Sequence, residues 1–183
     1  MSHTGLLTVA AVVLSSVCYP QPSGAPTMTD RENPVFRPPF TLRLQVDDQH
    51  YYEQHFDRIP YAAENEVYLF AGEAFGINVV IVRDQIAAVS YQKDPARADV
   101  DLAFTQEKSP HGPIMLLVIH NRLKKRLLMD ALMTVPGEEG VSKTNLLPVE
   151  PSLSNFETWP HPIVQLVLRN FRFSEKGLKQ VDP

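Results

Sequence analysis

Alternation of hydrophobic and polar residues along the chain predicts β-strands. The clearest case is FTLRLQV, residues 40–46, in which Phe40, Leu42, Leu44 and Val46 alternate with polar residues. Successive side chains of a strand point to opposite faces, so this period of two is typical of a half-buried strand.

Six further segments have the length and composition of strands. They are EVYLFAG (66–72), FGINVVIV (75–82), QIAAVSYQ (85–92), VDLAFTQ (100–106), PIMLLVIH (113–120) and IVQLVLRNFRF (163–173). Turn-forming residues, such as Arg83-Asp84 and the stretch EKSPHG, separate them. In the last segment Val164, Leu166 and Leu168 form the set that should face the core.

The segment RLLMDALMTV, residues 126–135, is compatible with two readings. As a strand it places Leu127, Met129, Ala131 and Met133 on one face, whereas a helix would put Asp130 inside the apolar stripe. We predict a strand, joined to PIMLLVIH by a hairpin turn.

The pattern as a whole predicts an all-β fold. Seven to eight strands at short spacing, with no alternation of strands and helices, favour an antiparallel β-sandwich, which we expect to be immunoglobulin-like and to span residues 40–183. The Cys-Trp-Cys signature of antibody domains is absent from the sequence.

One connection is unusually long. Residues 136–162 include five prolines and several apolar residues, and loops of this length are usually functional or disordered. It is either a loop packed across one end of the sandwich or a partner-binding surface. In the second case Phe156, Trp159 and His161, held by prolines, are the predicted binding residues.

The N-terminal region has the features of a targeting segment. Residues 1–29 contain no Asp, Glu, Lys or Arg, and residues 6–17 are an apolar run of twelve. A membrane-spanning helix needs about 20 apolar residues, so we predict no transmembrane span, a signal peptide over residues 1–25 and a Pro-rich tether over residues 26–39. The expected location is periplasmic or secreted, and the alternative is a cytosolic protein with an apolar arm.

Cys18 is the only cysteine, so no intramolecular disulfide can form. It follows the apolar run, where a bacterial lipoprotein carries its lipidated cysteine. However, Leu14 lies four places before it and the bulky Val17 is adjacent. We therefore expect no lipid anchor at Cys18.

The stretch VDDQHYYEQHFD, residues 46–57, is the candidate for metal chemistry. A strand there would place Glu53 and His55 on one face as a ligand pair and His50 on the other face, and a bend at Asp47-Asp48 could bring Asp48 to His50. The stretch lacks the fixed spacing of a zinc motif. A solvated edge whose aromatic residues cover the core is the alternative.

Other classes of site find little support. The chain has no GxSxG elbow and no glycine-rich phosphate loop, and its net charge is −4. The basic residues Arg122, Lys124, Lys125 and Arg126 fit a solvated turn in an acidic chain better than a nucleic-acid site, so we expect no nucleic-acid partner and no cofactor.

These observations predict an exported, non-enzymatic β-sandwich that binds a protein or a cell-envelope component. The alternative is a metal-binding protein or a metal-assisted hydrolase that uses His50, Glu53 and His55 within residues 47–57. A carrier of a small apolar ligand between the sheets is a third hypothesis.

Overall fold

The computed structural model describes residues 34–174, whose regular secondary structure is almost entirely antiparallel strands. The strands are β1 (Phe40–Gln45), β2 (Tyr51–Phe56), β3 (Ala62–Ala63), β4 (Glu66–Leu69), β5 (Glu73–Val82), β6 (Gln85–Gln92), β7 (Val100–Ser109), β8 (Gly112–Asn121), β9 (Leu127–Thr134), β10 (Ser142–Thr144), β11 (Ser154–Trp159) and β12 (Gln165–Phe173). One 3₁₀ turn, η1 (Pro95–Arg97), lies between β6 and β7.

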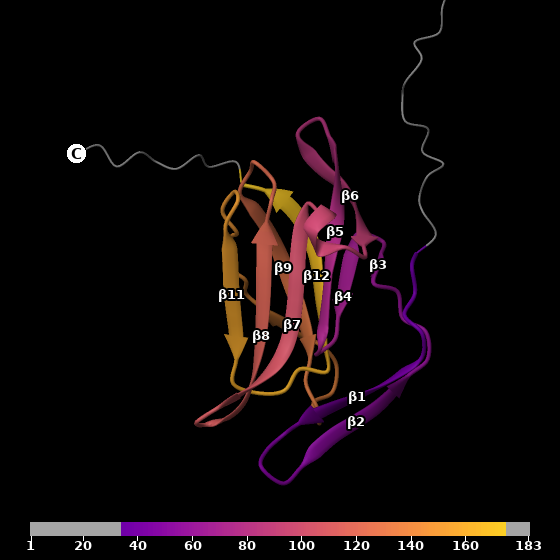
Figure 1. The fold of residues 1–183 in the computed structure, drawn as a ribbon, viewed down its shortest axis with the longest axis vertical. Helices are drawn as coiled ribbons and strands as arrows, with labels where there is room; N and C mark the ends of the chain where they lie inside the picture. Colours follow the sequence, from indigo (N-terminus) through magenta and orange to yellow (C-terminus); the bar gives the residue numbers. More distant parts are fainter. Residues whose placement is uncertain (1–33, 175–183) are drawn as a thin grey trace, which may run out of the picture. The chain divides into compact units, whose positions relative to one another are not determined.

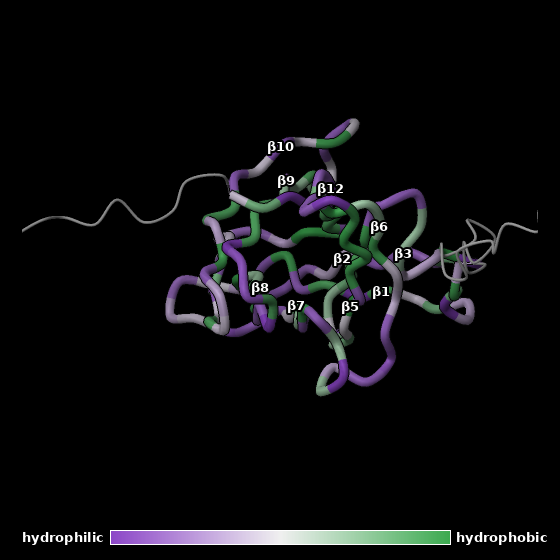
Figure 2. The backbone as a smooth tube through the Cα atoms, turned by 90° about the horizontal axis from the view of Figure 1, so that it is seen from above, coloured by the Kyte–Doolittle hydropathy of each residue, from purple (hydrophilic) through white to green (hydrophobic). Residues whose placement is uncertain are grey.

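Two five-stranded sheets form a sandwich. One sheet has the order β10-β9-β12-β4-β3 and the other has the order β11-β8-β7-β5-β6. Figure 1 shows the second sheet in front of the first, and Figure 2 shows the two layers from above, with hydrophobic positions along their strands. The predicted all-β antiparallel sandwich is confirmed, with more strands than the seven to eight expected.

The period-two pattern explains which side chains fill the space between the sheets. In β8 the residues Met115, Leu117 and Ile119 are fully buried and their neighbours are half-buried. They pack in one cluster with residues of the opposite sheet such as Leu166 and Leu168. Burying one such side chain contributes roughly 1.5–3 kcal/mol.

The ambiguous segment 126–135 is a strand, as predicted. Leu127, Met129 and Ala131 of β9 are buried, and β9 pairs with β12. In β12 the register shifts after Arg169, where Asn170 has a φ of 54°. This bulge lets the next apolar residue, Phe171, return to the core, since a bulge inserts one extra residue and changes the facing of those that follow.

The predicted hairpin between residues 113–120 and residues 126–135 is wrong. β8 belongs to one sheet and β9 to the other, so residues 122–126 cross between the layers. The buried side chain of Asn121 stabilises this crossing: its amide donates to the carbonyls of Lys125 (2.8 Å) and Val149 (3.0 Å), and its oxygen accepts from Leu123 N–H (3.0 Å).

The long connection of residues 136–162 is more regular than a loop. It contains β10 and β11, each an edge strand of a different sheet. The two alternatives drawn from the sequence, a covering loop or a partner-binding loop, therefore both miss that this segment extends the sandwich itself.

The β1–β2 hairpin is a separate two-stranded sheet with its own small core. Leu42 and Leu44 are buried against Phe70 and Val164, and the ring of Phe40 stacks on that of Phe56 at 5.3 Å. The hairpin is also tied to β7, because the Gln106 side chain accepts from Gln45 N–H (2.8 Å) and donates to Gln45 C=O (2.9 Å).

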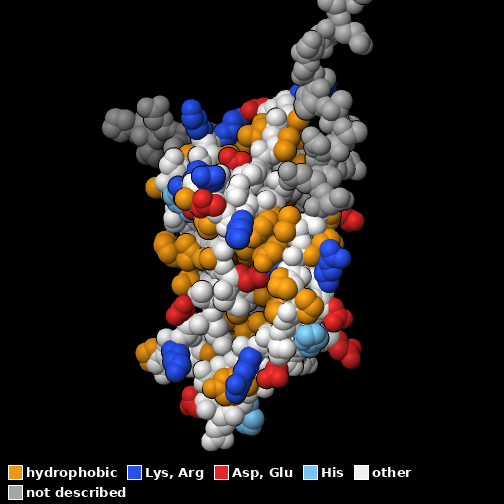
Figure 3. All heavy atoms as spheres, turned by 45° about the vertical axis from the view of Figure 1, so that its right-hand side comes forward, with side chains coloured by type: hydrophobic (Ala, Val, Ile, Leu, Met, Phe, Trp, Pro, Cys, Tyr) orange, Lys and Arg blue, Asp and Glu red, His pale blue; other side chains and the backbone are white. Residues whose placement is uncertain are grey.

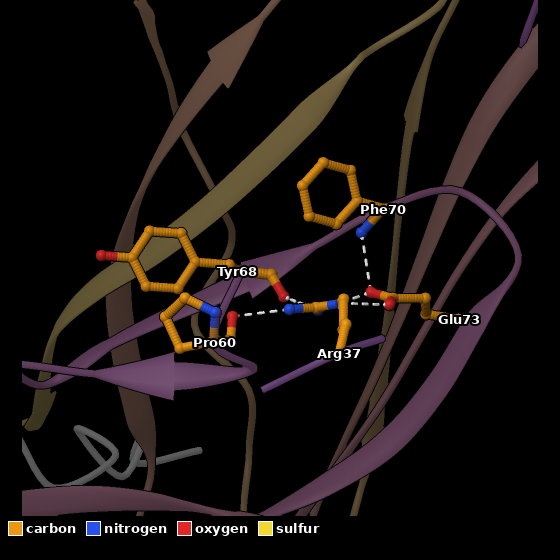
Figure 4. Close-up of polar contacts among 5 residues, drawn as sticks. All are labelled: Arg37, Pro60, Tyr68, Phe70 and Glu73. Carbon is orange, nitrogen blue, oxygen red and sulfur yellow. Dashed lines mark hydrogen bonds and ion pairs between the residues drawn. The ribbon is translucent and has the colours of Figure 1, made fainter. Parts of the chain in front are cut away.

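A buried arginine joins the segment ahead of β1 to the sandwich (Figure 4). Arg37 is 3% exposed and forms a two-pronged ion pair with Glu73, at 2.5 and 2.7 Å. Two further N–H groups donate to the carbonyls of Pro60 and Tyr68, and its guanidinium lies 4.0 Å from the centre of the Tyr61 ring. Each of these contacts helps to repay the cost of removing the charge from water.

The described part of the predicted tether, residues 34–39, belongs to the same compact unit as the sandwich. Arg37 N–H donates to Ile59 C=O, and Tyr61 N–H donates to Val35 C=O. The folded region therefore begins earlier than residue 40. The predicted signal peptide, the rest of the tether and Cys18 lie outside the described residues.

Candidate functional site

The predicted aromatic binding residues lie on or just after β11, but they do not share one surface. Trp159 is 8% exposed and faces the core. Its indole N–H donates to the Thr144 hydroxyl at 3.0 Å, and its ring meets Phe104 edge-on, with centroids 6.4 Å apart. A buried tryptophan with a hydrogen-bond partner is typical of a core residue.

Phe156 and His161 have different surroundings from Trp159. Phe156 is three residues earlier on the same strand, so it faces outward, and it is 63% exposed. His161 is half-buried, with its Nδ1 atom 3.2 Å from the carbonyl oxygen of Pro162. Of the three, only Phe156 presents a large apolar side chain to solvent.

His50 of the His/acid stretch lies in the turn between β1 and β2. Its side chain is 73% exposed, and its Nδ1 atom lies 2.8 Å from the nearer carboxylate oxygen of Asp47. The alternative drawn from the sequence, a bend that brings Asp48 to His50, named the neighbouring residue instead. The backbone N–H groups of Gln49 and His50, with the His50 ring, hold the pKa of Asp47 below its usual value.

Glu53 and His55 lie on the outer face of β2, two residues apart, as the strand reading predicts. His55 lies near Thr41, with 3.3 Å between Nδ1 and the hydroxyl, and near Asp57, with 3.5 Å between Nε2 and the carboxylate. Nowhere in residues 34–174 do three or more His, Cys, Asp or Glu side chains come together as a metal-binding group.

The outer face of the β11-β8-β7-β5-β6 sheet carries a more coherent feature. Phe156 pairs with Val118, Val118 with Ala103, and Ala103 with Ala74. Residues paired across neighbouring strands point to the same face, so these four side chains form one line across β11, β8, β7 and β5. We call this line the apolar row.

More apolar residues of β8 flank the apolar row on one side. Leu116 is the next outward residue and Ile114 the one after it, and both are half-buried. β8 is therefore apolar on both faces although only one faces the core. The sequence carried this signal, because residues 114–119 are apolar without interruption.

Polar residues border the apolar row on its other side. Ser154, His120 and Asp101 are aligned there, with His120 Nδ1 3.0 Å from the Ser154 hydroxyl. Asp101 forms an ion pair with Arg122 at 2.6 Å. An apolar centre with a polar rim is the usual anatomy of a protein-binding surface.

No described strand crosses in front of β11, β8 and β7 in Figure 1. In Figure 3, hydrophobic side chains are visible across the middle of the molecule, and charged side chains are more frequent toward its two ends.

The basic cluster of residues 122–126 is largely neutralised. Arg122 pairs with Asp101, Lys125 with Asp84, and Arg126 with Glu150. Paired cations have less charge to offer to phosphate groups than free ones.

No protein-family model, curated protein or solved structure matches the chain. Within residues 34–174, no helix has the length and apolar character needed to cross a bilayer.

Proposed function

We propose that the chain is an exported, non-enzymatic β-sandwich module that binds a protein through the outer face of the β11-β8-β7-β5-β6 sheet. The observation that carries this proposal is the apolar row, with Phe156 63% exposed at one end of it. Aromatic residues, phenylalanine among them, are enriched in the buried centres of protein interfaces.

The neighbouring side chains support this choice. Thr158 and Thr105 flank Leu116 on the adjacent strands, so the apolar surface is bordered by short side chains that leave it accessible. The β1–β2 hairpin, in contrast, directs Tyr51, Glu53 and His55 to solvent and keeps its apolar side chains against Phe70.

Site-specific photocrosslinking tests the binding surface. A benzophenone amino acid at position 156, in the cells that produce the protein, should give a covalent adduct with another polypeptide, which mass spectrometry then identifies. The same probe at Val141, which is also 63% exposed but lies outside the sandwich strands, is the matched control.

A second substitution checks that the adduct depends on the surface. Ala103→Lys places a charge in the middle of the apolar row, and it should abolish the adduct formed at position 156. Equal adduct yields at positions 156 and 141, or a yield that Ala103→Lys leaves unchanged, would contradict the proposal.

Export is supported by the apolar run of residues 6–17 and has an independent test. Intact-mass measurement of the protein from its producing cells should find a first residue between about 19 and 27, where signal peptidases cleave after small residues. A chain that still begins at Met1 would overturn the export part of the proposal.

A further inference from the structure

The apolar row has a bulky residue at one end and small residues at the other. Phe156 and Val118 lie on β11 and β8, while Ala103 and Ala74 lie on β7 and β5. The row therefore combines a projection and a recess of similar extent, each covering two strands. A surface of this kind can fit against a copy of itself.

The symmetry that achieves this fit is a twofold axis parallel to the strands, lying over the line between β8 and β7. Such an axis places Phe156 of one copy over Ala74 of the other, and Val118 over Ala103. The same pairs recur on the opposite side of the axis, as a closed twofold interface requires. We infer that the occupant of the apolar row is a second copy of this chain; this inference rests on the proposed function.

The charges of the face agree with this arrangement. The same axis places His120 of one copy over Asp101 of the other, so an imidazole faces a carboxylate twice in the dimer. Glu107, the other outward acidic residue of β7, pairs with Ile114 within the sheet and so faces Ile114 of the second copy. No like charges meet among these outward residues of β7 and β8.

The 3₁₀ turn η1 lies over this face beside the row. A side chain at Gly76 would meet Ala98, which follows η1, so η1 covers the outward side of Gly76. In the dimer η1 lies against the edge strand β11 of the second copy, where the residue aligned with Gly76 is the small Ser154.

The overlapping area is that of a weak dimer. An axis between β8 and β7 places four strands over one another, β11 over β5 and β8 over β7. β8 and β7 have ten residues each and β11 has six, so at about 4.8 Å between strands and about 3.3 Å per residue the overlap covers roughly 500 Å² per partner. Interfaces below about 600 Å² per partner are typical of weak or transient association.

Sedimentation velocity of the full chain over a range of concentrations tests the inference. The wild type should shift from monomer to dimer as the concentration rises, and Phe156→Asp should weaken the dimer by about tenfold or more, because it replaces an aromatic contact of the interface with a charge. Val141→Asp makes the same kind of change outside the row, and it should leave the dimer as in the wild type.

A mixing experiment separates a lost contact from a damaged fold. His120→Glu faces Asp101 with a second carboxylate, and Asp101→Lys faces His120 with an ammonium, so each variant alone should be mostly monomeric. An equimolar mixture should form the heterodimer, because the introduced carboxylate of one chain then faces the introduced ammonium of the other and the second contact keeps its original pair. No heterodimer in the mixture would overturn the inference.

The outcomes distinguish this inference from the proposed function. The wild type could stay monomeric while the probe at position 156 captures a different protein, in an adduct that Ala103→Lys abolishes. This result would overturn the second copy as the occupant of the apolar row and retain the row as a protein-binding surface. Adducts between two copies, together with a dimer weakened by Phe156→Asp, support both. A dimer that Phe156→Asp and Val141→Asp affect equally overturns the assignment of the dimer to this face.

Discussion

The two sheets present different faces to their surroundings. The outer face of the β11-β8-β7-β5-β6 sheet carries the apolar row, whereas the outer face of the other sheet carries Asp130, Arg169 and Arg172 in cross-strand ion pairs. Arg172 lies 3.1 Å from Asp130, and Arg169 lies 3.7 Å from Glu66.

We call the outer face of the β10-β9-β12-β4-β3 sheet the charged face. Its polar side chains form hydrogen bonds and ion pairs with one another. Tyr68 donates its hydroxyl to Glu66 at 2.9 Å, and burial of this hydroxyl with the adjacent carboxylate raises the pKa of Tyr68 to about 12. A solvated sheet face is expected to carry such pairs. The charged face also carries Leu132 and Val167 side by side, so the two outer faces differ in their share of charged side chains, and this difference is the reason why we propose the apolar row as the surface that a partner covers.

The largest expected effect contrasts the two sides of β11. Trp159→Ala should lower the free energy of unfolding by about 3–5 kcal/mol, because it leaves a cavity in the core. Phe156→Ala should change it by no more than about 0.5 kcal/mol, because the side chain is exposed. Urea unfolding at low protein concentration measures both, and equal losses would show that the inward and outward positions are wrongly assigned.

A smaller contrast concerns where ion pairs matter. Arg37→Ala leaves the carboxylate of Glu73 without its partner in a site where the arginine is 3% exposed, and it should cost about 3 kcal/mol. Arg172→Ala removes an ion pair from the charged face, where the arginine is 47% exposed, and it should cost less than about 1 kcal/mol. Denaturant midpoints of the two variants give the comparison, and similar losses would contradict it.

The smallest effect is a dependence on pH confined to the charged face. The Asn170 amide, with the Arg172 guanidinium, holds the pKa of Asp130 below its usual value of 3.8. A lowered pKa in the folded state contributes stability above the unfolded pKa, and this stability is lost as the pH falls through the folded value. Asp130→Asn should therefore be less stable than the wild type at pH 7 and pH 5, by under about 1 kcal/mol.

The difference between Asp130→Asn and the wild type should shrink at pH 3 and below, as the wild-type carboxylate takes up its proton. Urea unfolding at the three pH values measures it. Asp57→Asn makes the same change of charge at a side chain that is 95% exposed and serves as the control. A difference that grows toward low pH would contradict the assigned direction.

Local patterns predicted the strands well because the alternation of hydrophobic and polar residues within each strand shows which side chains face the core. The alternation in residues 126–135 identified β9, and Val164, Leu166 and Leu168 were correctly assigned to the core. The change of sheet at residues 122–126 was missed, since a hairpin and a crossing between sheets need the same short polar turn. The hydrogen bond from Asn121 to the carbonyl of Val149, which distinguishes the crossing from a hairpin, joins residues 28 positions apart.

The candidate site was predictable only in part. Phe156 was singled out from the sequence. The alternation in NFETW also places Trp159 on the opposite face of the strand from Phe156. Because residues 136–162 were interpreted as a loop, this alternation was not used. The rest of the apolar row depends on the order β11-β8-β7-β5. Which strands become neighbours is decided by contacts distant in sequence, so Ala103 and Ala74 carry no local signal of their own.

The buried position of Arg37 has a consequence for the order of folding. Its ion-pair partner Glu73 is 36 residues later in the chain, so at a synthesis rate of about 5–20 residues per second the arginine emerges about 2–7 s before Glu73 does. A charged side chain spends this interval in water without cost. A leucine at the same position would spend it as exposed apolar surface, the condition under which nascent chains associate wrongly.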